Sequence, residues 1–132
     1  MTVGSYTLTA EQQIAGPQTA VAMTPITGLD GMRSTCLDVS FAYGSGGTSV
    51  FIVVQTSLDG GNWRDVARFD FTTSSLAKTA TIVVASKAVG IHGVLSSEGQ
   101  IDGFLGNRLR AVLTTTGTYA NTTLAARAAV QI

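Results

Sequence analysis

Charge, cysteine and histidine are all scarce in this chain of 132 residues, and each scarcity excludes a class of protein. Only 12% of the residues are charged, and eight basic side chains balance eight acidic ones. A neutral chain lacks the electrostatic footprint of a nucleic-acid binder, so we expect no nucleic acid as partner. One cysteine excludes an intramolecular disulfide, and one histidine leaves no Cys/His cluster for zinc. Because phosphate-binding and dinucleotide-binding glycine motifs are also missing, we expect neither a metal nor a cofactor.

Long apolar runs are missing too. No apolar run approaches the roughly 20 residues that a membrane-spanning helix needs. The segment Met1–Ala10 lacks the basic start and apolar centre of a secretory signal. The sequence therefore predicts a protein that is synthesised in a cytoplasm and has no membrane partner.

The chain has enough apolar residues for one core. Hydrophobic residues make up 45% of it, and 132 residues suit a single domain over positions 1–132. Thr, Ser, Gly and Ala take the place of charged residues. Weakly charged surfaces repel one another little and are tolerated when an assembly covers them. We therefore expect a homo-oligomer, with an ordinary Ser/Thr-rich surface as the simpler alternative.

Short β-branched and aromatic runs between glycine-rich turns predict an all-β fold, because helical periodicity is nearly absent. We expect an eight-stranded antiparallel β-sandwich that is jelly-roll-like, with an immunoglobulin-like sandwich as the alternative. The expected strands are Ser5–Ala10, Thr19–Met23, Ser34–Tyr43, Ser49–Thr56, Trp63–Phe71, Thr79–Ala85, Arg108–Thr115 and Thr123–Gln131. The turn around Asp59–Asn62 joins the fourth and fifth strands as a hairpin, and Gly117–Asn121 joins the last two.

Alternation within these strands predicts which side chains enter the core. Leu37, Val39, Phe41 and Tyr43 share one face of the third strand, and Trp63, Asp65, Ala67, Phe69 and Phe71 share one face of the fifth. The unbroken apolar run of the fourth strand predicts a central strand buried on both faces. We therefore expect Phe41, Phe51 and Phe69 to be largely buried, together with the thiol of Cys36.

The segment from about 86 to 106 is expected to be a long interaction loop, with room for a short helical turn. Loops of this length in compact domains are usually functional. Its apolar side chains are too many to leave in water, so some should return to the core and the rest should meet another subunit. Its candidate contact residues are Val94, Leu95 and Phe104.

Basic and aromatic side chains on the strands add further candidates for partner binding. Arg64 and Arg68 alternate on one strand, and Arg108 and Arg110 alternate on another. Together they could dock an acidic protein surface, or they could be ordinary solvated charges. Trp63 either begins a core strand in a buried position or stands open as a platform for a sugar ring.

Catalysis has little support in the residues. His92 could in principle combine with Ser96 or Ser97 and with Asp102. Geometry defines such a triad, and no nucleophile-elbow pattern surrounds either serine. We therefore expect that the protein is not an enzyme.

Two parts of the chain carry a family resemblance. The first is the segment Val53–Ala67, which reads VVQTSLDGGNWRDVA and leads into Phe69–Thr73. The second consists of Leu109–Val112 and Thr115–Tyr119. These segments resemble small structural proteins encoded in the virion gene clusters of tailed phages and prophages. The resemblance implies a non-enzymatic β-sandwich part of a virion and does not say which part. Among such parts we expect a capsid decoration or cement protein, and the alternative is a neck or tail component. Its partners would be the major capsid protein or neck and tail proteins. A carbohydrate-binding β-sandwich module is the alternative from another class.

Overall fold

The structure, a computed structural model, describes residues 4–132, which form strands joined by turns and loops without a helix. Eight long strands match the predicted ones, and three pairs of residues form short additional strands. The strands are β1 (Gly4–Ile14), β2 (Gln18–Ala22), β3 (Ser34–Ala42), β4 (Ser45–Gly46), β5 (Ser49–Ser57), β6 (Arg64–Phe71), β7 (Leu76–Val83), β8 (Gly99–Gln100), β9 (Arg108–Thr116), β10 (Tyr119–Ala120) and β11 (Thr122–Gln131).

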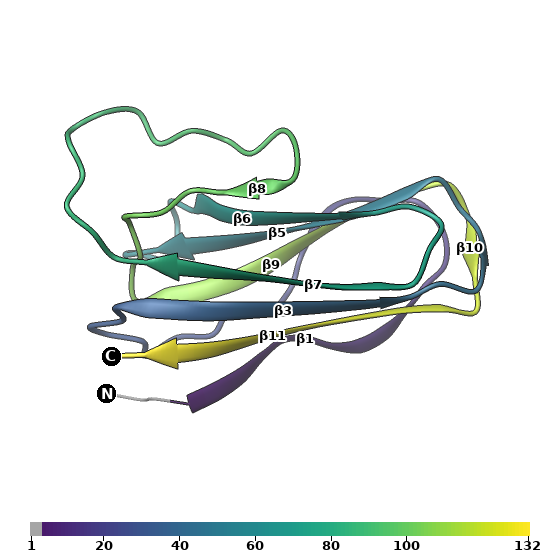
Figure 1. The fold of residues 1–132 in the computed structure, drawn as a ribbon, viewed down its shortest axis with the longest axis horizontal. Helices are drawn as coiled ribbons and strands as arrows, with labels where there is room; N and C mark the ends of the chain where they lie inside the picture. Colours follow the sequence, from purple (N-terminus) through teal and green to yellow (C-terminus); the bar gives the residue numbers. More distant parts are fainter. Residues whose placement is uncertain (1–3) are drawn as a thin grey trace.

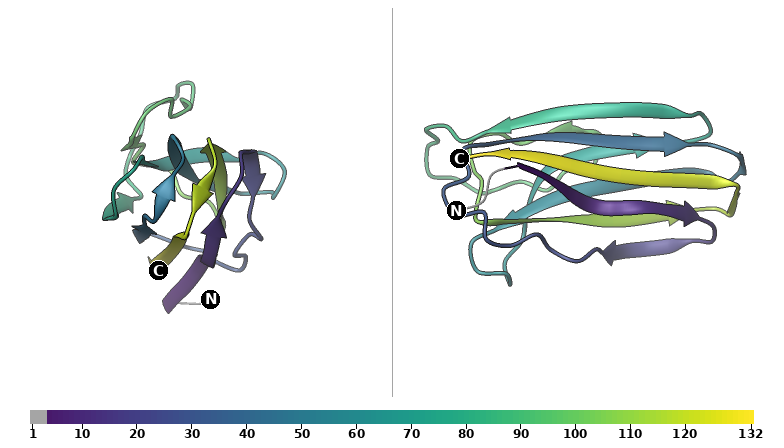
Figure 2. Two further views of the ribbon diagram at one scale, coloured as in Figure 1. Left: turned by 90° about the vertical axis from the view of Figure 1, so that its right-hand side faces the viewer. Right: turned by 90° about the horizontal axis from the view of Figure 1, so that it is seen from below.

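Two antiparallel sheets pack face to face and confirm the predicted β-sandwich (Figures 1 and 2). The four-stranded sheet has the order β1-β11-β3-β7, and the five-stranded sheet has the order β2-β9-β5-β6-β8. The short pair β4 and β10 closes one end. The amino-terminal end of β1 and the carboxyl end of β11 lie together at the other end (Figure 1).

The core lies between the sheets, and period-two alternation builds it as predicted. Leu37, Val39 and Phe41 of β3 are at most 2% exposed, and the intervening side chains of β3 are exposed. Phe69 and Phe71 of β6 enter from the opposite sheet. On β11 the buried apolar side chains are the predicted ones: Leu124, Ala126, Ala128 and Val130.

The β5–β6 hairpin is confirmed, and β5 is a central strand between β9 and β6. Gly60 has a φ of 78° in the connecting turn, a conformation that glycine adopts without a Cβ clash. The Asp59 carboxylate accepts hydrogen bonds from the backbone N–H groups of Asn62 and Gly61 at 2.8 and 2.9 Å. These bonds hold the pKa of Asp59 far below its usual value, because they favour the ionised form.

The prediction of a terminal hairpin is wrong. β9 pairs with β5 and β2 in the five-stranded sheet, whereas β11 pairs with β1 and β3 in the other sheet. The connection through Gly117 and β10 therefore crosses from one sheet to the other. Consecutive strands often pair, but the chain can also bury both strands by placing one in each layer.

Three predicted side-chain placements are also wrong. Phe51 is only partly buried, because it lies on the outer face of the five-stranded sheet beneath the Arg68 guanidinium, 3.8 Å from its ring centre. Cys36 is exposed, because it alternates with the inward-facing Leu37. Asp65 does not share the core face with Ala67, because a bulge places Val66 between them and pairs Asp65 with Gln55.

Candidate functional site

The most unusual part of the molecule is the long connection from β7 to β9, which arches beside the five-stranded sheet (Figure 1). The prediction of a long loop is confirmed, but in place of a helical turn it contains β8, which pairs with β6. Backbone bonds hold it at several points. The N–H of Ile101 donates to the carbonyl of Val66 at 2.9 Å, and the N–H of Asn107 donates to that of Ser57 at 3.0 Å.

A buried carboxylate holds the exposed half of this loop. Asp65 is 8% exposed, and its Oδ2 accepts a hydrogen bond from the N–H of Leu95 at 3.0 Å. Its Oδ1 accepts one from Nε2 of Gln55 at 2.8 Å. The backbone carbonyl of Asp65 lies 2.7 Å from Nε2 of His92. Alternation alone could not identify this anchor, since the bulge that turns Asp65 outward leaves no local signal.

The contacts continue from Gln55 to two of the predicted site residues. Arg110 donates from Nε to Oε1 of Gln55 at 2.9 Å, and its guanidinium carbon lies 4.3 Å from the Trp63 ring centre. Partial burial lowers the pKa of the Arg110 guanidinium. Trp63 is partly exposed and donates from Nε1 to the carbonyl of Gly60 at 3.1 Å. The expectation that Trp63 begins a core strand is therefore wrong.

Arg68 ties the other side of the loop to β6. Its Nε lies 2.8 Å from Oδ1 of Asp70, and one terminal nitrogen donates to the carbonyl of Leu95 at 3.2 Å. Glu98 accepts hydrogen bonds from Lys78 at 2.5 Å and from the N–H of Asp70 at 2.9 Å. Partial burial acts to raise the pKa of Glu98, but these two bonds and the positive charge of Lys78 together outweigh it and lower the pKa.

The basic residues predicted to dock an acidic surface differ in how free they are. Arg68 and Arg110 are partly buried and bonded as described above, and Arg108 donates from Nε to Oδ1 of Asn107 at 2.9 Å. Arg64 is exposed and borders a shallow hollow with Phe104. The structure therefore leaves Arg64 as the most accessible of the four.

Apolar side chains of the loop divide into two groups. Leu105 packs against the core, and Leu95 and Phe104 are partly buried, as expected for the part that folds back. Ile91 is 99% exposed and Val94 is 83% exposed, and Val89 is fully exposed. The loop thus presents three apolar side chains to solvent from a base that hydrogen bonds hold in place.

The residues weighed for catalysis are not assembled into a triad. The Nε2 atom of His92 bonds to a backbone carbonyl, whereas Asp102 accepts from the side chain of Gln100 at 2.9 Å and from the N–H of Val83 at 3.3 Å. Over residues 4–132, no group of three or more His, Cys, Asp or Glu side chains is placed to hold a metal ion.

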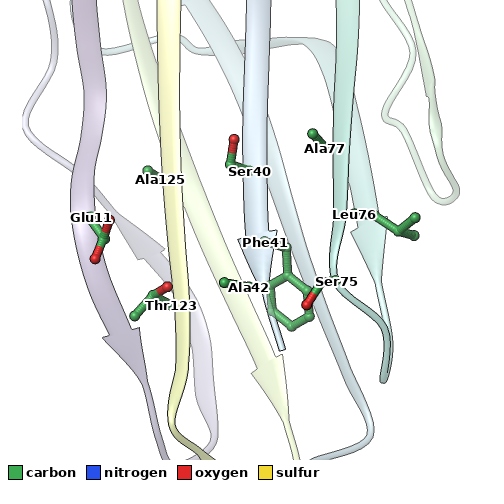
Figure 3. Close-up of a pocket in the computed structure, with 9 residues that line it drawn as sticks. All are labelled: Glu11, Ser40, Phe41, Ala42, Ser75, Leu76, Ala77, Thr123 and Ala125. Carbon is green, nitrogen blue, oxygen red and sulfur yellow. The ribbon is translucent and has the colours of Figure 1, made fainter. Parts of the chain in front are cut away.

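A second surface, the outer face of the four-stranded sheet, is built from small side chains. Figure 3 shows Ala125, Ser40 and Ala77 in one row across β11, β3 and β7. A neighbouring row carries two charges, because Arg127 of β11 lies opposite Asp38 of β3. We call this surface the bare face, because no other segment among residues 4–132 lies over it in either view of Figure 2.

Comparison with known protein families, with curated proteins and with solved structures gives no match to this chain. Within residues 4–132 there is no helix of the length and apolar character needed to cross a membrane.

Proposed function

We propose that this protein is a non-enzymatic structural component of a tailed-phage virion, acting as a capsid decoration or cement protein. The observation that carries the proposal is the set of three exposed apolar side chains, Val89, Ile91 and Val94, on a loop anchored by Asp65. Exposed apolar patches mark protein contacts. A loop already held in place loses less conformational entropy on docking than a free one.

The size of the expected contact suits a protein that works in many copies. Burying a Val or Ile side chain contributes about 1.5–3 kcal/mol, so three contribute about 5–9 kcal/mol before the costs of association. One loop would therefore bind weakly by itself. On a shell with repeated sites, several linked contacts reinforce one another. A protein that binds the assembled shell and not its free subunits also stabilises the shell by mass action.

The partner in this proposal is the major capsid protein, and a neck or tail protein would serve the alternative position in the same particle. The protein would be made in the host cytoplasm and end in the virion. Its neutral composition supports a protein partner over a nucleic acid. The carbohydrate-binding alternative has less support, because Arg110 already stacks on the Trp63 ring. The carbonyl of Gly60 also already accepts the hydrogen bond from the indole N–H of Trp63.

The test begins with mass spectrometry of particles purified from a host that carries the gene. The chain should be present in many copies, and its absence would overturn the virion role. Particles that lack the protein are then mixed with purified chain and sedimented. The triple variant Val89→Ser, Ile91→Ser, Val94→Ser should bind at least about tenfold more weakly.

A matched control removes apolar surface elsewhere. Val21 and Leu58 are 40% and 61% exposed and lie outside the loop. The double variant Val21→Ser, Leu58→Ser should bind particles as the wild type does. Equal loss in both variants would assign the binding to general surface apolarity and contradict the role of the loop. Specific glycan binding that Trp63→Ala abolishes would favour the carbohydrate-binding module.

A further inference from the structure

The bare face is flat, and its charges are complementary to those of a second copy of the same face. One row of residues crosses the four-stranded sheet in the order Thr7, Arg127, Asp38 and Thr79, one from each strand. All four side chains are exposed, so they point away from the core. The middle of this face thus carries one positive and one negative charge side by side, between two threonines.

The two charges do not pair within the chain. Both ion pairs found in residues 4–132 are elsewhere, between Arg68 and Asp70 and between Lys78 and Glu98. Around Asp38 and Arg127, the neighbouring outward positions on β3 and β11 hold Cys36, Ser40, Ala125 and Ala129. Small side chains of this kind let another flat surface approach closely.

We propose that the bare face is the contact surface for a second copy of this chain, packed sheet against sheet about a two-fold axis. In a face-to-face dimer the axis lies between the two sheets. If it runs along the strands, between β3 and β11, Asp38 of each copy lies over Arg127 of the other. If it runs across the strands, Asp38 lies over Asp38 and Arg127 over Arg127. The charges therefore favour the first arrangement and oppose the second.

The area of the face is compatible with a specific dimer. Neighbouring strands lie about 4.8 Å apart, and each residue advances a strand by about 3.4 Å. Four strands of nine residues, the length of β3, therefore cover roughly 590 Å² on each partner. The total of about 1,200 Å² is at the lower limit for specific interfaces and above most crystal contacts. Aligned sheets also pack with strand directions within about 30°, which the axis along the strands allows. This surface is separate from the loop, so the dimer does not depend on the virion role.

Charge reversal tests the arrangement. Asp38→Arg and Arg127→Asp each place like charges opposite one another across the axis, so each should weaken dimerisation at least about tenfold in sedimentation velocity. The double variant Asp38→Arg, Arg127→Asp recreates two unlike pairs and should restore the dimer. Asp30→Arg changes the net charge equally on an exposed loop residue outside the face, and it should dimerise normally.

Cys36 gives an independent reading, because it lies on the same face one row away from Asp38 and is exposed in the single chain. Its reaction with a thiol reagent should slow as the protein concentration rises, and the two single charge reversals should abolish that protection. A wild-type protein that stays monomeric at millimolar concentration would overturn the proposal. So would a dimer that tolerates both single reversals and leaves Cys36 reactive.

Discussion

The two outer faces of the sandwich are treated in opposite ways. The five-stranded sheet has large and polar side chains on its outer face, and the segment between β7 and β9 is bonded to them through Asp65 and Arg68. The four-stranded sheet has mostly Ala, Ser and Thr outside. The first face therefore holds a loop of its own chain, and the second is left flat. This contrast gives a chain of zero net charge two distinct exposed surfaces, one apolar and projecting, the other flat.

The largest expected effect separates the inner and outer sides of the five-stranded sheet. Phe69→Ala removes a ring that is 4% exposed and should lower the free energy of unfolding by about 3–5 kcal/mol. Phe51→Ala removes a partly exposed ring under Arg68 and should cost about 1–2 kcal/mol. Urea denaturation of both variants measures the difference. Equal losses would mean that Phe51, on the outer face of the five-stranded sheet, is buried as fully as Phe69 in the core.

A second comparison sets the carboxylate under the loop against the one on the bare face. Asp65→Ala leaves the N–H of Leu95 and the amide of Gln55 without their acceptor, so it should cost about 1–3 kcal/mol. It should also speed hydrogen exchange at Leu95. Asp38→Ala, measured in dilute monomer, should change stability by less than about 0.5 kcal/mol. An unchanged exchange rate at Leu95 in Asp65→Ala would contradict the anchoring role.

The smallest expected effect concerns pH at the edge of the loop-bearing face. Glu98 has a lowered pKa in the folded protein, so the stability it contributes is present above its unfolded value of 4.5 and is lost as the pH falls through the lower folded value. Because Glu98 is exposed, Glu98→Gln should cost at most about 1 kcal/mol at pH 7. The melting temperatures of variant and wild type should converge once the pH has fallen below the folded pKa of Glu98. A difference that persists there would contradict an origin in the ionised carboxylate.

The sequence predicted the strands better than their partners. Alternation in β3 and β11 placed the inward side chains correctly, because a half-buried strand repeats every two residues wherever it lies. The sequence also predicted the β5–β6 hairpin correctly, because its turn residues are a local signal. It misjudged Phe51, because an apolar run does not say whether the second face will be covered by protein or by water.

The candidate site was predictable in part. The length and composition of the segment predicted the loop. Val94, one of its predicted contact residues, is among the exposed apolar side chains. The anchor at Asp65 could not be predicted, because it depends on a bulge in β6 and on a backbone group thirty residues away. The stacking of Arg110 on Trp63 likewise joins β9 to the residue before β6, and these two strands are not neighbours in their sheet.

Local pattern was sufficient for the fold class, the strand positions and most inward-facing side chains, since each depends on residues close together along the chain. The division of β9 and β11 between two sheets, the outward turn of Asp65 and the cross-strand row of Arg127 and Asp38 arise only in the folded molecule. They depend on contacts between distant segments, because strand pairing and bulges are set by how the two layers bury their apolar faces together.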